Sequence, residues 1–161
     1  MRSFRNKIKE RDELKRIIED LKDEGKRIVF TNGCFDILHL GHVVYLEEAR
    51  LKGDVLIVGV NTDSSVKQIK GQHRPIVPQE ERMAVLAALE SVDYVVPFAE
   101  PDPFMLISHL RPHILVKGGD WDEERVVGKE LVEQTFILPY VKGASTSRII
   151  ETILQRYSKQ R

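Results

Sequence analysis

His39 and His42 are separated only by Leu40 and Gly41, and this spacing suits two imidazoles acting together. Residues three apart lie side by side on a helix, so both rings would project together if a helix starts here. The free amides of a helix start favour anions, Gly41 lets a ligand approach the backbone, and imidazole can donate to phosphoryl oxygens. A zinc site is the weaker hypothesis, because one cysteine and two histidines provide no clear third and fourth ligand. Capping or half-buried histidines are the structural alternative.

The segment TNGCFD, residues 31–36, precedes the histidines and follows an apolar run that resembles a strand. Small and turn-forming residues in this place can expose backbone amides to a phosphate, and the residues concerned are Thr31, Asn32, Gly33 and Phe35. Neither G-x-G-x-x-G nor G-x-x-x-x-G-K-[ST] occurs in the chain. Cys34 fits a small buried hydrophobe better than a nucleophile, and Phe35 has core packing as its alternative role.

Basic side chains follow the second apolar run in the segment SSVKQIKG. One helical turn would bring Lys67 and Lys70 to the same side, where they could act as point charges for phosphates. Gly71 then begins a segment that is expected to be a loop. Two solvated surface lysines are the alternative interpretation.

Two arginines further along the chain are candidate anion ligands on the acceptor side. These are Arg74 and Arg82. Because Glu80 and Glu81 are close in sequence, ion pairs with these carboxylates are the alternative.

Two later segments carry polar residues that could face a nucleotide. In KGGDW, Gly118 and Gly119 would let a base or ribose lie against the backbone while Asp120 accepts a hydroxyl hydrogen bond; a tight turn with Trp121 packing is the alternative. Three hydroxyl residues, Ser145, Thr146 and Ser147, precede an apolar stripe at helical spacing. One of them is expected to cap the last helix, and the others can face phosphates together with the free amides.

The elements that position these residues alternate along the chain. Short apolar runs predict strands at 27–30, 55–60, 94–96, 114–116 and 136–138. Helical periodicity predicts a first helix that ends near residue 25, and others at 43–51, 78–89, 104–110 and from 145 onward. This alternation predicts a single α/β domain, doubly wound and Rossmann-like, with a five-stranded parallel sheet. Polar segments follow four of the strands, at the edge where such sheets bind ligands.

Composition narrows the classes of partner. The chain has 161 residues, 42% of them hydrophobic, with 25 basic and 25 acidic side chains. Zero net charge provides no general field for nucleic acid or an anionic membrane, and no apolar run approaches the roughly 20 residues that span a bilayer. A single cysteine and a highly charged N-terminus without a signal-peptide core predict a cytoplasmic protein. We expect one domain over 1–161: a packed amphipathic helix within 1–25, a core over 26–150 and a helix at 145–159.

Several motifs agree in order with one enzyme group. A strand followed by G-x-F-D and His-x-Gly-His resembles the nucleotidyltransferase superfamily that includes glycerol-3-phosphate cytidylyltransferase and phosphopantetheine adenylyltransferase. The segments RIVFTNGCFDILHLGHVVYLEEAR, VGVNTDSSVKQIKG, RPIVPQEERMAVLAALESVDYVV, ILVKGGDW and STSRII resemble the D-glycero-β-D-manno-heptose 1-phosphate adenylyltransferases within it. This resemblance covers residues 25–150.

The resemblance implies that a sugar 1-phosphate oxygen attacks the α-phosphorus of ATP and expels pyrophosphate, with Mg²⁺ held mainly by phosphates and water. It implies that His39, His42 and Lys70 are catalytic and that residues 31–33, Phe35 and Gly41 cradle the triphosphate. Asp36 would orient a donor or approach the acceptor phosphate, together with the basic residues described above. A homodimer is compatible with the resemblance, and a separate sugar kinase is expected to supply the substrate.

One departure bears on the base. Related cytidylyltransferases carry an Arg-Thr-Glu-Gly-Ile-Ser-Thr run, whereas residues 140–146 read YVKGAST. The missing arginine favours ATP over CTP, although Lys142 is near enough to compensate. Two alternatives stay open: a cytidylyltransferase for a polyol or aminoalcohol phosphate, and a nucleotide-binding sensor without catalysis.

Overall fold

The computed structural model describes residues 3–119 and 122–158. Its five strands form one sheet in which every pairing is parallel, in the order β3-β2-β1-β4-β5. The strands are β1 (Ile28–Gly33), β2 (Val55–Asn61), β3 (Tyr94–Phe98), β4 (Ile114–Gly118) and β5 (Gln134–Leu138). The predicted fold class and the five predicted strands are therefore confirmed.

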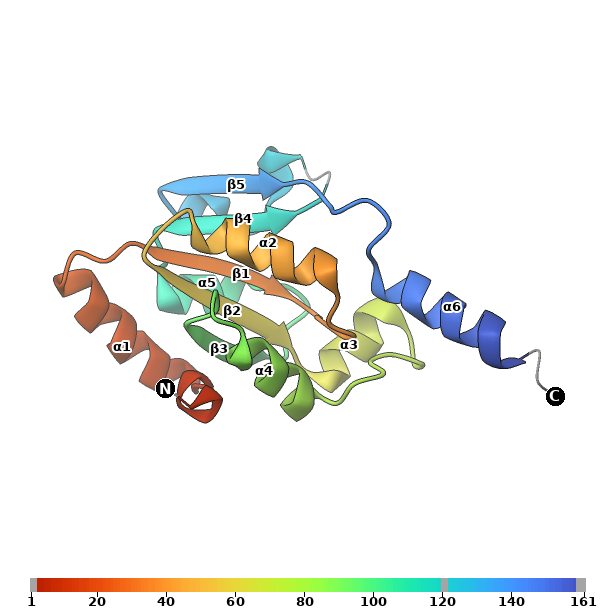
Figure 1. The fold of residues 1–161 in the computed structure, drawn as a ribbon. Helices are drawn as coiled ribbons and strands as arrows, with labels where there is room; N and C mark the ends of the chain where they lie inside the picture. Colours follow the sequence, from red (N-terminus) through yellow and green to blue (C-terminus); the bar gives the residue numbers. More distant parts are fainter. Residues whose placement is uncertain (1–2, 120–121, 159–161) are drawn as a thin grey trace.

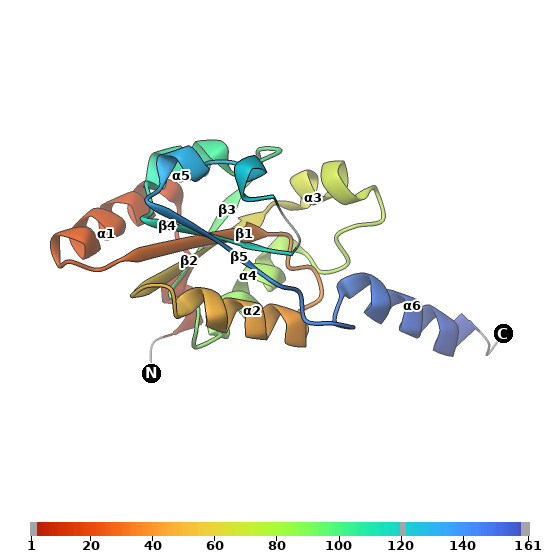
Figure 2. The same ribbon diagram turned by 90° about the horizontal axis from the view of Figure 1, so that it is seen from above.

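Helices cover both faces of this sheet (Figures 1 and 2). One face carries α2 (Leu40–Arg50) and α4 (Gln79–Ala88), and the other carries α1 (Arg11–Asp23) and α5 (Phe104–Leu110). The remaining elements are α3 (Asp63–Lys70), α6 (Thr146–Tyr157) and the short 3₁₀ helices η1 (Phe4–Lys7), η2 (Glu123–Arg125) and η3 (Lys129–Leu131). Figure 1 shows α6 extending away from the sheet, and none of its residues is buried.

Burial explains why these apolar runs became strands. Every residue of β2 is buried, as expected for a central parallel strand that is covered on both faces. One buried cluster joins the sheet to α2 and α4 through residues such as Leu46 and Leu86, and a second joins it to α1 and α5 through Leu14 and Leu106. As predicted from its periodicity, the first helix packs its apolar stripe on the sheet.

The strand order places the polar segments at one edge. The chain passes from β3 to β4 on the other side of β1, so the order reverses between β1 and β4. Ligands bind beyond the carboxyl ends of the strands at such a reversal. Residues 63–70 form a complete helix, α3, where the sequence suggested a single turn; Thr62 caps its start by accepting a hydrogen bond from the Ser65 amide at 3.3 Å, and Gly71 follows its end at φ 98°.

Candidate active site

The two histidines lie together at the start of α2. His39 is the N-cap residue, and its Nδ1 accepts a hydrogen bond from the Gly41 amide at 3.1 Å. The His39 and His42 rings are stacked, with centroids 3.8 Å apart and an interplanar angle of 23°. Because Nδ1 of His39 is an acceptor, the neutral ring carries its proton on Nε2 and can donate from there.

His42 combines burial with an unpartnered nitrogen. Its Nδ1 is buried and has no hydrogen-bond partner among the described residues, while its ring meets Phe35 edge-on at 5.2 Å between centroids. Burial, aided by the neighbouring His39, lowers the pKa of His42 to about 4, and burial also lowers the pKa of His39. Both imidazoles are therefore neutral at pH 7 in the free chain. An adjacent polyanion would favour the charged form and raise these pKa values.

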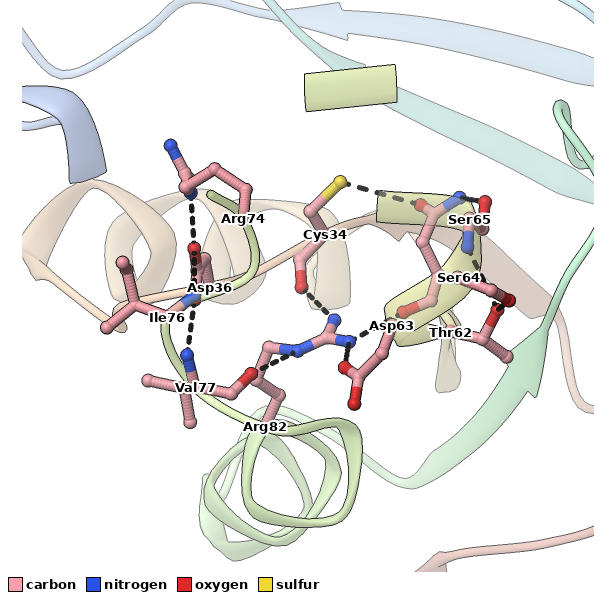
Figure 3. A network of polar contacts seen from close by, with 11 residues as sticks. Cys34, Asp36, Thr62, Asp63, Ser64, Ser65, Arg74, Ile76, Val77 and Arg82 are labelled. Carbon is pink, nitrogen blue, oxygen red and sulfur yellow. Dashed lines mark hydrogen bonds and ion pairs between the residues drawn. The ribbon is translucent and has the colours of Figure 1, made fainter. Parts of the chain in front are cut away.

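Asp36 holds the loop that follows α3 (Figure 3). Its carboxylate is 4% exposed and accepts hydrogen bonds from the amides of Ile76 and Val77, at 2.9 and 2.8 Å, and from Nε of Arg74. Burial alone would raise the pKa of Asp36, but the Val77 and Ile76 amides and the Arg74 guanidinium together hold it below its usual value. Asp36 thus holds the Arg74 guanidinium in place, and both roles predicted for Asp36 toward a ligand stay predictions.

Arg82 occupies a different place from the one predicted. Its side chain is fully buried and donates to the carbonyl oxygens of Val77, Cys34 and Asn61 and to Oδ1 of Asp63 (Figure 3). The alternative, an ion pair with Glu80 or Glu81, does not form either, because α4 directs this side chain inward to Asp63. Arg82 joins the loop after β1, the end of β2 and the start of α3, and it does not reach the solvent side where an acceptor phosphate would lie.

Two lysines lie at the end of α3. Lys67 and Lys70 are exposed in the last turn of α3, and the structure records no ion pair for either among the described residues. Burial raises the pKa of the Cys34 thiol, opposed by the nearby charges of Lys70, Arg82 and Arg74. Lys70 and Arg74 are therefore close enough to the loop after β1 for their charges to act on Cys34. Because the raised pKa keeps Cys34 in its thiol form, this side chain is a poor nucleophile, as expected from the sequence.

Lys117 is a site residue that the sequence reasoning missed. Its Nζ donates to Oδ1 of Asn32 at 2.6 Å, at the adjoining carboxyl ends of β4 and β1. Burial lowers the pKa of Lys117 to about 8, and the charge of Asp102 opposes this shift. The signal available in the sequence was a lysine directly after the apolar run 114–116, whereas its burial and its partner Asn32 come from the fold.

Thr31 differs from its neighbours in the predicted cradle. It is fully buried, and its hydroxyl lies 2.6 Å from Oη of Tyr45, which donates to the Val116 carbonyl at 3.1 Å. The Thr31 side chain therefore packs inside the domain. Gly33 ends β1, and Phe35 lies in the turn that follows it, in the left-handed region at φ 47°.

Tyr140 covers the glycine pair that was expected to meet the base. A Cβ atom at Gly119 would lie 2.4 Å from Cε2 of Tyr140, and one at Gly118 would lie 3.2 Å from Cε2 of Tyr45. Tyr140 therefore leaves no room for a side chain at Gly119, and contact between a base and this backbone stays a prediction. Asp120, predicted to bind a hydroxyl, lies outside the described residues.

The start of α6 also contributes residues to the candidate site. Ser145 caps the helix by accepting a hydrogen bond from the Arg148 amide at 3.2 Å, and Thr146 donates to the Ile37 carbonyl at 3.4 Å. A cavity of about 470 Å³ extends between His39 and this helix start, where residues 141–145 line it. The predicted cap is present, Ser147 is exposed, and two helix starts face one cavity. Such starts offer free amides to phosphates.

The doubly wound sheet and the paired histidines at an amide-rich helix start define a nucleotidyltransferase of the α/β type. A family model described as cytidylyltransferase-like matches residues 30–152. The chain belongs to this family.

Curated relatives agree with the family. The bifunctional protein HldE of Pelobacter propionicus is 54% identical over 157 residues, which are 95% of this chain and 32% of that protein. HldE of a Nitratiruptor species is 56% identical over 144 residues, covering 89% of this chain and 31% of that protein. The chain thus spans about a third of the length of these relatives.

Two solved structures share the fold. The lipopolysaccharide core biosynthesis protein from Thermoplasma volcanium is 31% identical with a TM-score of 0.62, covering 74% of this chain and 100% of that one. Pantoate-beta-alanine ligase from Francisella tularensis has a TM-score of 0.61 at 17% identity, over 96% of this chain and 79% of that one, and shows the fold alone.

Proposed function

We propose that this chain transfers AMP from ATP to D-glycero-β-D-manno-heptose 1-phosphate and releases pyrophosphate and ADP-heptose, a precursor of the lipopolysaccharide core. The high identity to HldE proteins and the likeness to a lipopolysaccharide core biosynthesis protein support this substrate class. The observation that carries the chemistry is the stacked His39–His42 pair at the start of α2, with one buried nitrogen left unpartnered among the described residues.

The reaction needs alignment and charge stabilisation more than covalent catalysis. A phosphate oxygen of the sugar forms a bond to the α-phosphorus of ATP, and the bond from that phosphorus to the bridging oxygen of pyrophosphate breaks. In this proposal Nε2 of His39 donates to the triphosphate, and His42 gains a proton as negative charge approaches it. In this proposal the acceptor phosphate is bound by Lys67 and Lys70, which are exposed at the end of α3, and by Arg74, which Asp36 holds in place.

We propose that Mg²⁺ accompanies ATP and neutralises charge on the leaving pyrophosphate. Within the described ranges, no three His, Cys, Asp or Glu side chains gather to hold a metal, and the Asp36 carboxylate is already used by Arg74 and two amides. Phosphates and water would therefore supply its ligands.

We further propose a cytoplasmic enzyme, with a sugar kinase activity supplying the heptose 1-phosphate and a homodimer as the assembled form. No described helix has the length and apolar character needed to cross a bilayer.

Pyrophosphate release tests the function directly. The parent protein is assayed with ATP or CTP, each paired with heptose 1-phosphate or glycerol 3-phosphate. We expect turnover with ATP and heptose 1-phosphate, and a loss of about 10²–10³-fold in kcat for His42→Ala, as for removal of an oxyanion donor. His109→Ala is the matched control, because His109 pairs with Asp12 on the opposite face of the sheet.

Two outcomes would replace the proposal. A preference for CTP and glycerol 3-phosphate would establish the cytidylyltransferase alternative. Nucleotide binding without pyrophosphate release from any pair of substrates would establish the sensor.

A further inference from the structure

Tyr140 is a large aromatic residue left open to solvent at the edge of the sheet where the ligand is expected. It follows β5 by two residues, and it is 72% exposed. An exposed tyrosine is not unusual in itself. What distinguishes this one is the surface on which its ring rests.

The ring lies across the Gly118–Gly119 turn. A Cβ atom at Gly119 would lie 2.4, 2.6 and 2.7 Å from Cε2, Cζ and Oη of Tyr140, and one at Gly118 would lie 3.6 Å from Cε1. These atoms all belong to the hydroxyl end of the ring, so this end of the side chain lies against Gly119 and close to Gly118. The 72% exposure of the side chain leaves most of the ring open to solvent.

The backbone under the ring is held in place. Gly119 has φ 107°, which favours glycine, and its amide donates to the Leu138 carbonyl at 2.8 Å, which ties the turn to the end of β5. Tyr45 supports Gly118 from within the domain and is itself fixed by Thr31 and the Val116 carbonyl. The backbone next to the Tyr140 ring is therefore held in place by β5 and by Tyr45.

The position of the ring also suits a nucleotide. Residues 141–144 run from Tyr140 to Ala144, whose Cβ lies 3.2 Å from a Cβ placed at Gly41 beside the histidines. Four residues span at most about 14 Å, so the Cα atom of Tyr140 lies within roughly that distance of the Cα atom of Ala144, which contacts the start of α2. The cavity lined by His39 and residues 141–145 lies along this path.

We propose that Tyr140 is the platform on which the purine base of ATP stacks while the triphosphate extends to the start of α2. This inference rests on the proposed function and adds a residue that binds the base. The open part of the ring offers an aromatic surface to a flat base, and Gly119 is required because a side chain there would displace the ring. Stacking uses the ring and not the hydroxyl, so phenylalanine would serve as well as tyrosine.

Binding measured by calorimetry on the whole chain tests the platform, with two probes that differ only in the nucleoside. Tyr140→Leu is expected to weaken ATP binding by about 5- to 150-fold and to leave binding of inorganic tripolyphosphate within about twofold of the parent. Tyr140→Phe is expected to retain ATP affinity. Tyr157→Leu, an exposed tyrosine near the end of α6, is the matched control and should bind both probes as the parent does.

The outcomes separate this inference from the proposed function. A Tyr140→Leu variant that binds ATP as tightly as the parent, or that loses ATP and tripolyphosphate equally, overturns the platform even if the parent turns over ATP and heptose 1-phosphate. A parent that binds no ATP overturns the function and the platform together. Thermal unfolding of each variant shows whether it folds. If Tyr140→Leu does not fold, the ATP and tripolyphosphate affinities of Tyr140→Ile are compared with those of Tyr140→Phe, and the same outcomes apply.

Discussion

Replacing Asp36 with asparagine is expected to destabilise the protein in a pH-dependent way. The carboxylate is 4% exposed and accepts from two amides and from Arg74, whose side chain is 17% exposed. The substituted amide can still accept from the Ile76 and Val77 amides through its one oxygen, but its NH₂ group faces the Arg74 donor. Losing one charge-assisted hydrogen bond and leaving a mostly buried guanidinium unpaired costs about 2–4 kcal/mol in the free energy of unfolding at pH 7.

The pH dependence follows from the lowered pKa of Asp36. The folded chain holds this carboxylate charged to lower pH than the unfolded chain does, for which the ordinary value is 3.8. Its stabilising contribution is therefore complete well above pH 3.8 and is lost as the pH falls through the lower folded value. The difference between the parent and Asp36→Asn should be constant from about pH 8 to about pH 6 and should shrink in acid.

Urea unfolding of both proteins from about pH 8 to about pH 3 measures this difference. Asp122→Asn is the control, because Asp122 forms an exposed pair with Arg125 and its loss should cost less than about 0.5 kcal/mol. An Asp36→Asn protein within about 0.5 kcal/mol of the parent at pH 7, or a difference that does not change with pH, would refute the anchoring role of this carboxylate.

Two further predictions concern the buried cations. Arg82→Lys should lower the free energy of unfolding by about 2–4 kcal/mol in urea titrations, because an ammonium cannot reach the four oxygens that the guanidinium joins, and an unchanged midpoint would contradict this. Lys117→Met should raise the free energy of unfolding by about 1–3 kcal/mol at pH 7. Burial holds the pKa of Lys117 near 8, so the folded chain binds that proton less tightly than the unfolded chain does. Stability of the parent should rise between pH 8 and 10.5 as the penalty disappears, and that rise should be smaller in Lys117→Met; a variant less stable than the parent at every pH would contradict this.

The fold followed from local patterns that tertiary packing does not override. Runs such as 55–60 are apolar on both faces, which suits only a strand covered on both sides, and all five were found. The complete helix α3 was missed because Asp63, Ser64 and Ser65 favour turns in isolation. In the structure, Thr62 caps that helix and Asp63 is held by Arg82.

The site was predictable where it depends on spacing and not where it depends on contacts from distant segments. A spacing of three residues brings His39, the N-cap, close to His42, in the first turn of α2, and their rings are stacked. The partner of Arg82 is 19 residues away in sequence, and that of Lys117 is 85 residues away. Spacing along the chain carries no information about such pairs, so Arg82 was expected to bind an anion and Lys117 was overlooked.

The pKa of His42 reports whether the histidine pair meets the triphosphate of ATP. Nitrogen-15 NMR of the imidazoles, followed as a function of pH with and without ATP, measures this value. We expect a pKa of about 4 in the free protein and a clear rise with ATP bound, because the phosphates favour the charged ring. A His42 pKa that stays at its free value when ATP is bound would contradict the account.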